Sequence, residues 1–346
     1  AVLGAVFARP AMVALGTPAD VLEDALAYAR VMMLTMPVLL VFILATQLLR
    51  WVSDTISPLL ALLLSTALGL VLTPAFIQGW LGLPRLGTLS AAAASFLATL
   101  SALLFLAVRL RRLGHVMAPD RHLLAAFRPR REIMGKVLRI GLPTGVQMVV
   151  ISLSELVILA LVNRHGSQAT AAYGAVTQVV NYVQFPAISI AITASILAAQ
   201  AIGAGATERL GRILRTGLLL NLVLTGALVA LGYALSRPLL GLFLTQPEVL
   251  TQAVHLLHIL LWSFLLFGFQ AVIGGLMRAS GVVMVPTAIT IFCILVVQLG
   301  AAWWLEARFG LEGIWMAFPV AYLAMLGLQS LYYQLVWRHR RIRRLV

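Results

Sequence analysis

The stretch IGLPTGVQMVVISLSELVILALV at positions 140–162 decides the fold. It is long and mostly apolar, and Glu155 is its only ionisable residue. A helix that crosses a hydrocarbon core of about 30 Å needs about 20 residues, and only helices and closed barrels satisfy their backbone groups there. The stretch is long enough to cross, and it lacks the two-residue alternation of a barrel strand. It therefore predicts a membrane-spanning helix.

Eight further stretches share this length and apolar composition. They run approximately over positions 28–49, 59–78, 89–108, 173–202, 214–235, 249–277, 286–305 and 313–337. A shorter apolar run at positions 1–8 predicts the tail of another span, and we therefore expect the given sequence to begin within a helix. The predicted fold class is an all-α polytopic membrane protein.

Bulk composition agrees with a membrane environment and excludes other classes. Apolar residues make up 62% of the 346 residues and charged residues 10%, against about 25% charged in soluble domains. The net charge of +14 lies in short segments between apolar runs, so we expect lipid rather than nucleic acid as a partner. The single cysteine, Cys293, excludes an internal disulfide, and the N-terminus shows no signal peptide.

Positive charges favour one side of the membrane. If the chain changes sides at each span, 19 of the 25 Lys and Arg residues share a side, and only Arg9, Arg30, Arg85, Arg164, Arg237 and Arg308 lie opposite. Cytoplasmic loops carry this excess. The bias predicts a multi-pass protein of the bacterial inner membrane with its C-terminus in the cytoplasm.

An internal repeat divides the chain into two lobes. Four features recur 228 positions apart: Arg9-Pro10 with Arg237-Pro238, Arg50 with Arg278, Pro58 with Pro286, and Gly82-Leu83 with Gly310-Leu311. Equal sidedness of the copies predicts a parallel repeat of two pseudo-symmetric lobes. We expect an incomplete first lobe at 1–112, a basic cytoplasmic linker at 113–138 and a six-helix lobe at 139–346. If the lobes are alike, about 90 residues would precede position 1.

Glu155 is the first candidate for a functional residue. An acid at membrane depth is costly and usually marks function, here a proton or sodium site. Gln147 lies two helical turns before it, and Ser152 and Ser154 lie beside that face. The alternative is an acid that bonds a neighbouring helix or reaches the interface.

The next span carries a polar stripe of Thr177, Asn181 and Gln184, with Gln178 and Tyr182 beside it. Amides facing lipid are costly, so these side chains predict a cavity lining or bonds between helices. The same two interpretations hold for the single residues Gln270 and Gln298.

Enzyme chemistry has little support in the sequence. His255 and His258 are three residues apart, but no third metal ligand stands near them. We find no nucleophile motif and no paired carboxylates, and the glycines at 203–205 follow a long helix rather than a strand. We therefore expect no enzyme activity and no cofactor.

Several motifs together resemble multidrug and toxin extrusion (MATE) transporters. They are Gly141-Leu-Pro143, Ala171-Ala-Tyr-Gly174, Pro186, Ala199-Gln-Ala-Ile-Gly203-Ala-Gly205 and the turn Arg50-x-x-x-Asp54-x-x-x-Pro58. The resemblance covers essentially the whole chain. It implies two six-helix lobes around a V-shaped cavity, with export of amphipathic, often cationic compounds driven by sodium or proton entry.

Departures from the family pattern bear on the coupling ion. The resemblance places one family acid at Ile151, one turn before Glu155, and another at Phe267. Polar residues of another branch are replaced by Gly69 and Thr73. We therefore predict an antiporter, active as a monomer, in which Glu155 couples to H⁺ or Na⁺. Gln147, Ser154, Thr177, Gln178, Asn181, Gln184 and Gln270 are predicted to line its substrate cavity.

Two alternatives stay open. A flippase for a lipid-linked precursor would share the architecture but should carry a cationic cavity for pyrophosphate. A membrane scaffold or receptor without transport would need neither the parallel repeat nor the polar stripe.

Overall fold

The computed structural model describes residues 9, 22–82, 87–115, 117–118 and 131–339. The chain divides into two compact units, Ala1–Pro129 and Arg130–Val346, and each is described by itself. The division falls inside the predicted linker at 113–138. Predictions for the apolar start at 1–8, for linker residues 119–130 and for the basic tail at 340–346 lie outside the described residues.

Nine helices in the described part of the chain are long and apolar enough to cross a membrane, as predicted. They are Leu26–Trp51, Ile56–Gln78, Ser90–Arg112, Val137–Asn163, Ser167–Gly203, Arg209–Ala234, Pro247–Ala279, Met284–Phe309 and Leu311–His339. No strand occurs among the described residues. The all-α membrane fold class is therefore confirmed.

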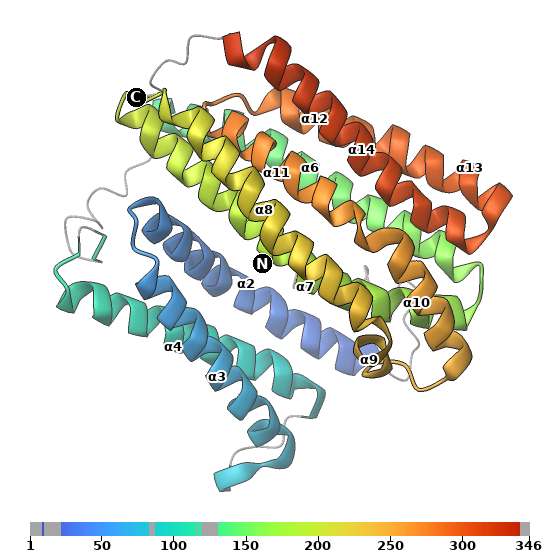
Figure 1. Cartoon of the computed structure of the whole chain (residues 1–346). Helices are drawn as coiled ribbons and strands as arrows, with labels where there is room; N and C mark the ends of the chain where they lie inside the picture. Colours follow the sequence, from blue (N-terminus) through green and yellow to red (C-terminus); the bar gives the residue numbers. More distant parts are fainter. Residues whose placement is uncertain (1–8, 10–21, 83–86, 116, 119–130, 340–346) are drawn as a thin grey trace. The chain divides into compact units, whose positions relative to one another are not determined.

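The described part of the first unit contains three long helices, α2 (Leu22–Trp51), α3 (Ile56–Gln78) and α4 (Ser90–Arg112). Helix α4 packs against both of the others (Figure 1). The small core of the unit includes Phe42, Leu49, Ala61, Ala102 and Leu106. Many other apolar side chains of these helices are exposed, which suits contact with lipid.

A polar cluster closes the turn between α2 and α3. Asp54 accepts a hydrogen bond from the backbone N–H of Ser57 at 3.0 Å, and Arg109 of α4 donates from Nε to the Ser57 hydroxyl at 3.1 Å. His115 Nε2 lies 3.9 Å from the Asp54 carboxylate. Burial raises the pKa of Asp54, but the Ser57 hydrogen bonds and the positive charge available at His115 outweigh it, so the pKa lies below its ordinary value.

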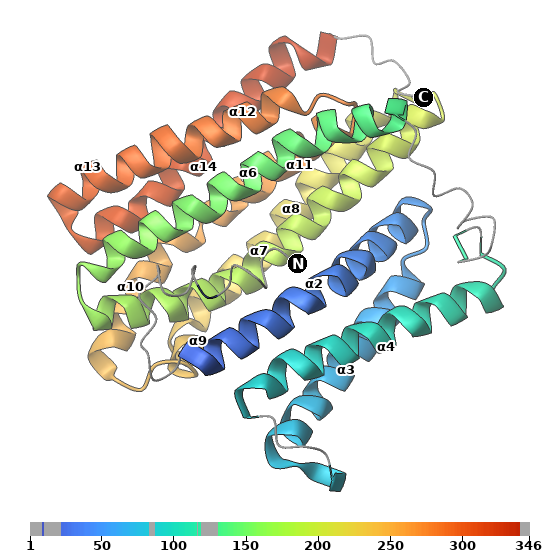
Figure 2. The same ribbon diagram turned by 180° about the vertical axis from the view of Figure 1, so that it is seen from behind.

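The second unit has nine α-helices and a π-helical segment within the described residues. They are α6 (Arg131–Asn163), α7 (Ser167–Gly203), α8 (Arg209–Ala234), α9 (Ser236–Gly241), α10 (Pro247–Leu261), α11 (Ser263–Ala279), α12 (Met284–Phe292), the π-helical segment Cys293–Gln298, α13 (Leu299–Phe309) and α14 (Leu311–Leu335). Helix α7 packs against α8, α10 and α11, and α14 packs against α11 and α13. Helix α6 contacts both α7 and α12, one on each side of it (Figure 2).

Small residues allow the central helices of this unit to approach closely. Helix α7 buries a row of alanines against its neighbours. At Gly275 of α11, an added Cβ would stand 2.9 Å from the carbonyl oxygen of Ala191, so the two backbones nearly touch. Close approach through small residues is how membrane helices gain packing energy without a hydrophobic driving force.

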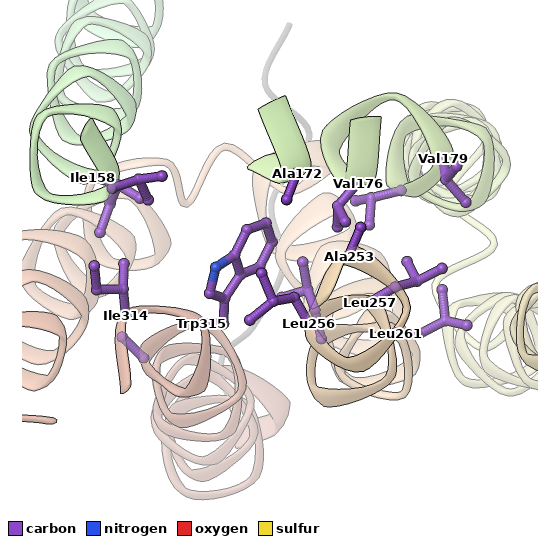
Figure 3. Packing of buried hydrophobic residues seen from close by; sticks show 14 of the residues in the cluster. Ile158, Ala172, Val176, Val179, Ala253, Leu256, Leu257, Leu261, Ile314 and Trp315 are labelled. Carbon is purple, nitrogen blue, oxygen red and sulfur yellow. The ribbon is translucent and has the colours of Figure 1, made fainter. Parts of the chain in front are cut away.

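The largest core cluster of the unit surrounds Trp315 of α14. Figure 3 shows its indole between Ala172 of α7 and Leu256 of α10, with Ile158 of α6 and Ile314 beside it. Trp315 is 2% exposed. This tryptophan therefore joins four helices of the unit.

Backbone details recur at the offset of the predicted repeat. Ser53 and Gly281 both adopt positive φ, at 66° and 81°, and so do Gly82 and Gly310, at 80° and 61°. Each pair is 228 positions apart. Arg109 donates to Ser57 in the first turn of α3, and Trp337, 228 positions later, donates from Nε1 to Ser280 in the turn after α11 at 2.8 Å. These local features agree with a parallel repeat.

Candidate functional site

Glu155 lies well inside the span Val137–Asn163, eight residues from its end. Every other acid of the described spans lies close to a span end, at Glu248, Glu306 and Glu312. The Glu155 side chain is exposed on the surface of the second unit. Its position makes it the one described carboxylate at the depth of the hydrocarbon core.

Two tyrosines from other helices lie within electrostatic range of Glu155. They are Tyr173 of α7 and Tyr322 of α14, which also act on each other. A tyrosine hydroxyl can donate a hydrogen bond to a carboxylate and accept one from a protonated acid. Three side chains that can carry a proton, on α6, α7 and α14, therefore lie within electrostatic range of one another.

Aromatic rings surround this region, and together they are called the aromatic cluster: Tyr173, Phe264, Phe267, Trp315, Phe318 and Tyr322. The ring centroids of Tyr173 and Trp315 are 5.4 Å apart, and those of Phe267 and Tyr322 also 5.4 Å. Phe264 meets Tyr322 edge-on at 5.8 Å. Phe318 joins Trp315 to Tyr322, with centroids 6.4 and 6.5 Å from them.

The local sequence explains how α14 contributes to the cluster. Trp315, Phe318 and Tyr322 follow one another at spacings of three and four, which places them on one face of a helix. Ala172 leaves room for the Trp315 indole on the facing helix (Figure 3). The indole Nε1 of Trp315 is a buried donor without a partner among the described residues.

The two predicted cavity residues of α6, Gln147 and Ser154, lie in different surroundings. Gln147 is half-buried, whereas Ser154 is 4% exposed, and its hydroxyl has no hydrogen-bond partner within the described chain. Glu155 faces outward beside it. Ser154 therefore lies toward the core of the unit and Glu155 toward its surface.

The polar stripe of α7 continues from the tyrosine that neighbours Glu155. Thr177 donates its hydroxyl to the carbonyl of Tyr173 at 2.8 Å, so this side chain is satisfied within its own helix. Asn181 and Gln184 are half-buried, and Gln178 is exposed. On α11, Gln270 is 8% exposed.

His255 and His258 serve separate contacts. The Nε2 atom of His255 lies 3.2 Å from Oε1 of Glu312. His258 lies against the ring of Tyr233 and 3.2 Å from the hydroxyl of Ser236. No group of three His, Cys, Asp or Glu side chains with metal-binding geometry is found among the described residues.

The polar residues of the sequence do not point to the aromatic cluster. Tyr173 belongs to the motif at 171–174, whereas Trp315 and Tyr322 stand in none of the motifs described above. The spacing of rings along 315–322 was an available signal. The site therefore combines an expected acid with unexpected aromatic neighbours.

The chain is similar to proteins that export drugs. Residues 143–304 match the family model described as MatE. Over 348 aligned residues the chain is 40% identical to "Probable multidrug resistance protein YoeA" of Bacillus subtilis, covering all of this chain and 75% of that protein. It is 23% identical to "Multidrug export protein MepA" of Staphylococcus aureus, covering 89% of this chain and 66% of MepA.

A solved structure shares the fold. The structure described as "Crystal structure of MATE in the bent conformation" matches with a TM-score of 0.84 at 21% sequence identity, over 96% of this chain and 73% of that one. The similarity in fold thus extends well beyond the region that matches the family model.

Proposed function

Because the chain belongs to the MatE family of multidrug efflux transporters, we propose that it is an antiporter that exports amphipathic, cationic compounds. Proton or sodium entry drives this export. Family membership also makes it a multi-pass membrane transporter rather than an enzyme. In this proposal it works as a monomer in the bacterial inner membrane, with a cytoplasmic C-terminus.

The observation that supports this proposal is the position of Glu155 at membrane depth, within electrostatic range of Tyr173 and Tyr322. A carboxylate in a medium of low dielectric constant favours neutralisation, whether by a proton, a metal ion or a cationic substrate. Ligands that compete for one charge are coupled, since binding of either lowers the affinity for the other. Glu155 can therefore exchange an entering cation for a departing one.

The half-buried rings of the aromatic cluster, those of Tyr173, Phe267 and Phe318, support a substrate with both charge and apolar surface. Ring faces attract cations that lie within about 6 Å of the ring centroid, and the rings also accept apolar groups. The half-buried amides of Asn181 and Gln184 offer hydrogen bonds along the neighbouring helix. A planar organic cation fits these three kinds of contact.

The site residues lie on three different helices, which explains how binding of a cation or a substrate can change the conformation of the protein. Glu155 lies on α6, and its tyrosine partners lie on α7 and α14. A ligand shifts a conformational equilibrium only by binding one state more tightly than the other. Neutralising Glu155 changes its interactions with both tyrosines, so the cation and the substrate favour different arrangements of these three helices.

Ethidium efflux from cells that produce the protein tests this function. Glu155→Gln removes the charge with little change in size, and we expect efflux to fall about tenfold or more, since coupling free energies between two ligands are typically about 1–3 kcal/mol. Glu155→Asp should retain part of the activity. Glu248→Gln, at the first turn of α10, is the matched control, because its acid lies at a span end.

Unchanged efflux in Glu155→Gln at equal protein level would remove this carboxylate from the mechanism. An equal loss of efflux in Glu248→Gln would show that removing a carboxylate lowers efflux through a general effect on folding or membrane insertion.

A further inference from the structure

The hairpin between α13 and α14 carries two acids at its tip. Helix α13 ends at Phe309, and Gly310 turns the chain at a φ of 61°. Glu306 lies in the last turn of α13 and Glu312 in the first turn of α14. The tip lies at the end of the unit that also holds the α6–α7 turn and α10, opposite the turn between α7 and α8 (Figure 1).

One acid of the tip contacts the turn between α6 and α7. His165 Nε2 lies 3.2 Å from Oε1 of Glu306, and these side chains are 30% and 15% exposed. The imidazole also approaches Gly310, where its Cε1 atom would stand 4.0 Å from an added Cβ. This pair therefore joins the tip to a turn 141 residues earlier in the chain.

The other acid of the tip contacts α10. His255 Nε2 lies 3.2 Å from Oε1 of Glu312, and both side chains are largely exposed, at 61% and 48%. Exposed ion pairs contribute little individually. Two pairs on one short hairpin nevertheless act on the same element, from two different parts of the unit.

We propose that His165–Glu306 and His255–Glu312 form a proton-operated clasp, which fastens the α13–α14 tip to the α6–α7 turn and to α10 when the medium is acidic. Histidine side chains gain a proton between about pH 8 and pH 5. A charged imidazolium donates a shorter and stronger hydrogen bond to a carboxylate than a neutral ring does. The clasp is therefore tight at low pH and weak at high pH.

Other charged and titratable residues lie on the same elements as the two His–Glu pairs. Arg164 precedes His165, and Arg308 lies over the ring of Trp304 at 4.0 Å, two residues from Glu306. On the other side, Glu248 lies two turns before His255 on α10, His258 lies three residues after it, and Arg237 is in α9. The carboxylate within hydrogen-bonding distance of His165 is that of Glu306.

The clasp bears on the transport site through α14. This helix carries Glu312 of the clasp and, further along, Trp315 and Tyr322 of the aromatic cluster. Fastening its first turn limits movement of these rings relative to Tyr173 of α7. This consequence depends on the proposed function, whereas the clasp itself can be tested without any transport.

Amide hydrogen exchange of the purified chain in detergent tests the clasp. At pH 5.5, peptides covering 299–314 should exchange at least about threefold faster in the His165→Gln, His255→Gln double variant than in the unaltered protein, since two pairs of a few tenths of a kcal/mol each are lost. At pH 8.0 the two proteins should exchange alike. Comparison at equal pH removes the intrinsic dependence of exchange on pH.

Glu306→Gln with Glu312→Gln should reproduce the acidic effect, because it removes the other half of each pair. His115→Gln, in the first unit, is the histidine control and should leave these peptides unchanged. Equal exchange of the double variant and the unaltered protein at pH 5.5 would overturn the clasp, and so would a difference of the same size at both pH values. Loss of ethidium efflux in Glu155→Gln is independent of either result.

Discussion

Tyr322 combines two roles that single substitutions can separate. Its ring packs against Phe264 and Phe267, while its hydroxyl acts on Glu155. Tyr322→Phe keeps the ring and removes the hydroxyl. We expect ethidium efflux to fall by up to about tenfold with little change in melting temperature, because the variant removes the electrostatic interaction of the hydroxyl with Glu155, and coupling free energies are typically about 1–3 kcal/mol.

The matched control for this prediction is Tyr333→Phe on the same helix. That ring stacks on Trp337 with centroids 5.1 Å apart, away from Glu155 along α14. Efflux should be unchanged in this control. If Tyr322→Phe transports normally, or if both variants lose activity equally, the hydroxyl of Tyr322 does not act on the site.

Asp54 predicts a pH dependence of stability in the first unit. Its folded-state pKa is lowered, so its contribution is complete above the unfolded value near 4 and is lost as the pH falls through the folded value. Asp54→Asn should reduce stability at pH 7 by about 0.5–1 kcal/mol, because the amide still caps the helix but carries no charge. Thermal unfolding in detergent measures the difference.

The gap between the Asp54→Asn variant and the unaltered protein should close as the pH falls below the lowered folded-state pKa of Asp54, where the carboxyl is protonated in both folded and unfolded chains. A gap that persists there would mean that the charge of Asp54 is not the source of the effect.

At the scale of elements, the contact between α8 and α11 depends on one glycine. Asn221 of α8 is fully buried, donates to the carbonyl of Leu265 at 3.3 Å and accepts from Thr225 at 2.8 Å. A Cβ at Gly268 would overlap the Asn221 amide. Gly268→Ala should therefore lower the unfolding free energy by about 1–3 kcal/mol, seen as a lower melting temperature.

Gly300 of α13 is the control for this prediction, because an added Cβ there meets no atom within 4 Å. Gly300→Ala should leave the melting temperature unchanged or raise it, since alanine favours helix. A harmless Gly268→Ala would show that α8 and α11 pack less closely than described.

The spans were predictable from the sequence, but their interruptions were not. The predicted span at 249–277 is broken at Trp262 between α10 and α11, and the next span contains the π-helical segment Cys293–Gln298. Near the break, the hydroxyl of Tyr233 bonds the carbonyl of His258 at 2.8 Å. Length and apolarity locate a span, whereas such a break depends on a partner from another helix.

The candidate site was predictable only in part, for a related reason. Glu155 stands out because a carboxylate is rare at membrane depth. Tyr173, Trp315 and Tyr322 do not, because a membrane helix is apolar on every face, so hydrophobic periodicity cannot reveal which face meets a neighbour. The packing of α6, α7 and α14 brings Tyr173 and Tyr322 within electrostatic range of Glu155.

At the scale of the whole molecule, two sequence features were most informative. The charge bias and the 228-residue offset were both visible without coordinates. Positive φ at Ser53 and Gly281 and at Gly82 and Gly310 now gives that offset a physical basis, since equivalent turns need the same left-handed backbone. The roles of the predicted cavity residues, from Gln147 to Gln270, stay predictions.

The central claim is that one carboxylate couples the entry of a cation to the exit of a substrate. Proteoliposomes that contain the purified protein, with a proton or a sodium gradient imposed separately, test it most directly. Ethidium transport should follow one of the two gradients in the unaltered protein and should be absent in Glu155→Gln under that gradient. Equal gradient-driven transport by Glu155→Gln, or transport that follows neither gradient, would contradict the claim.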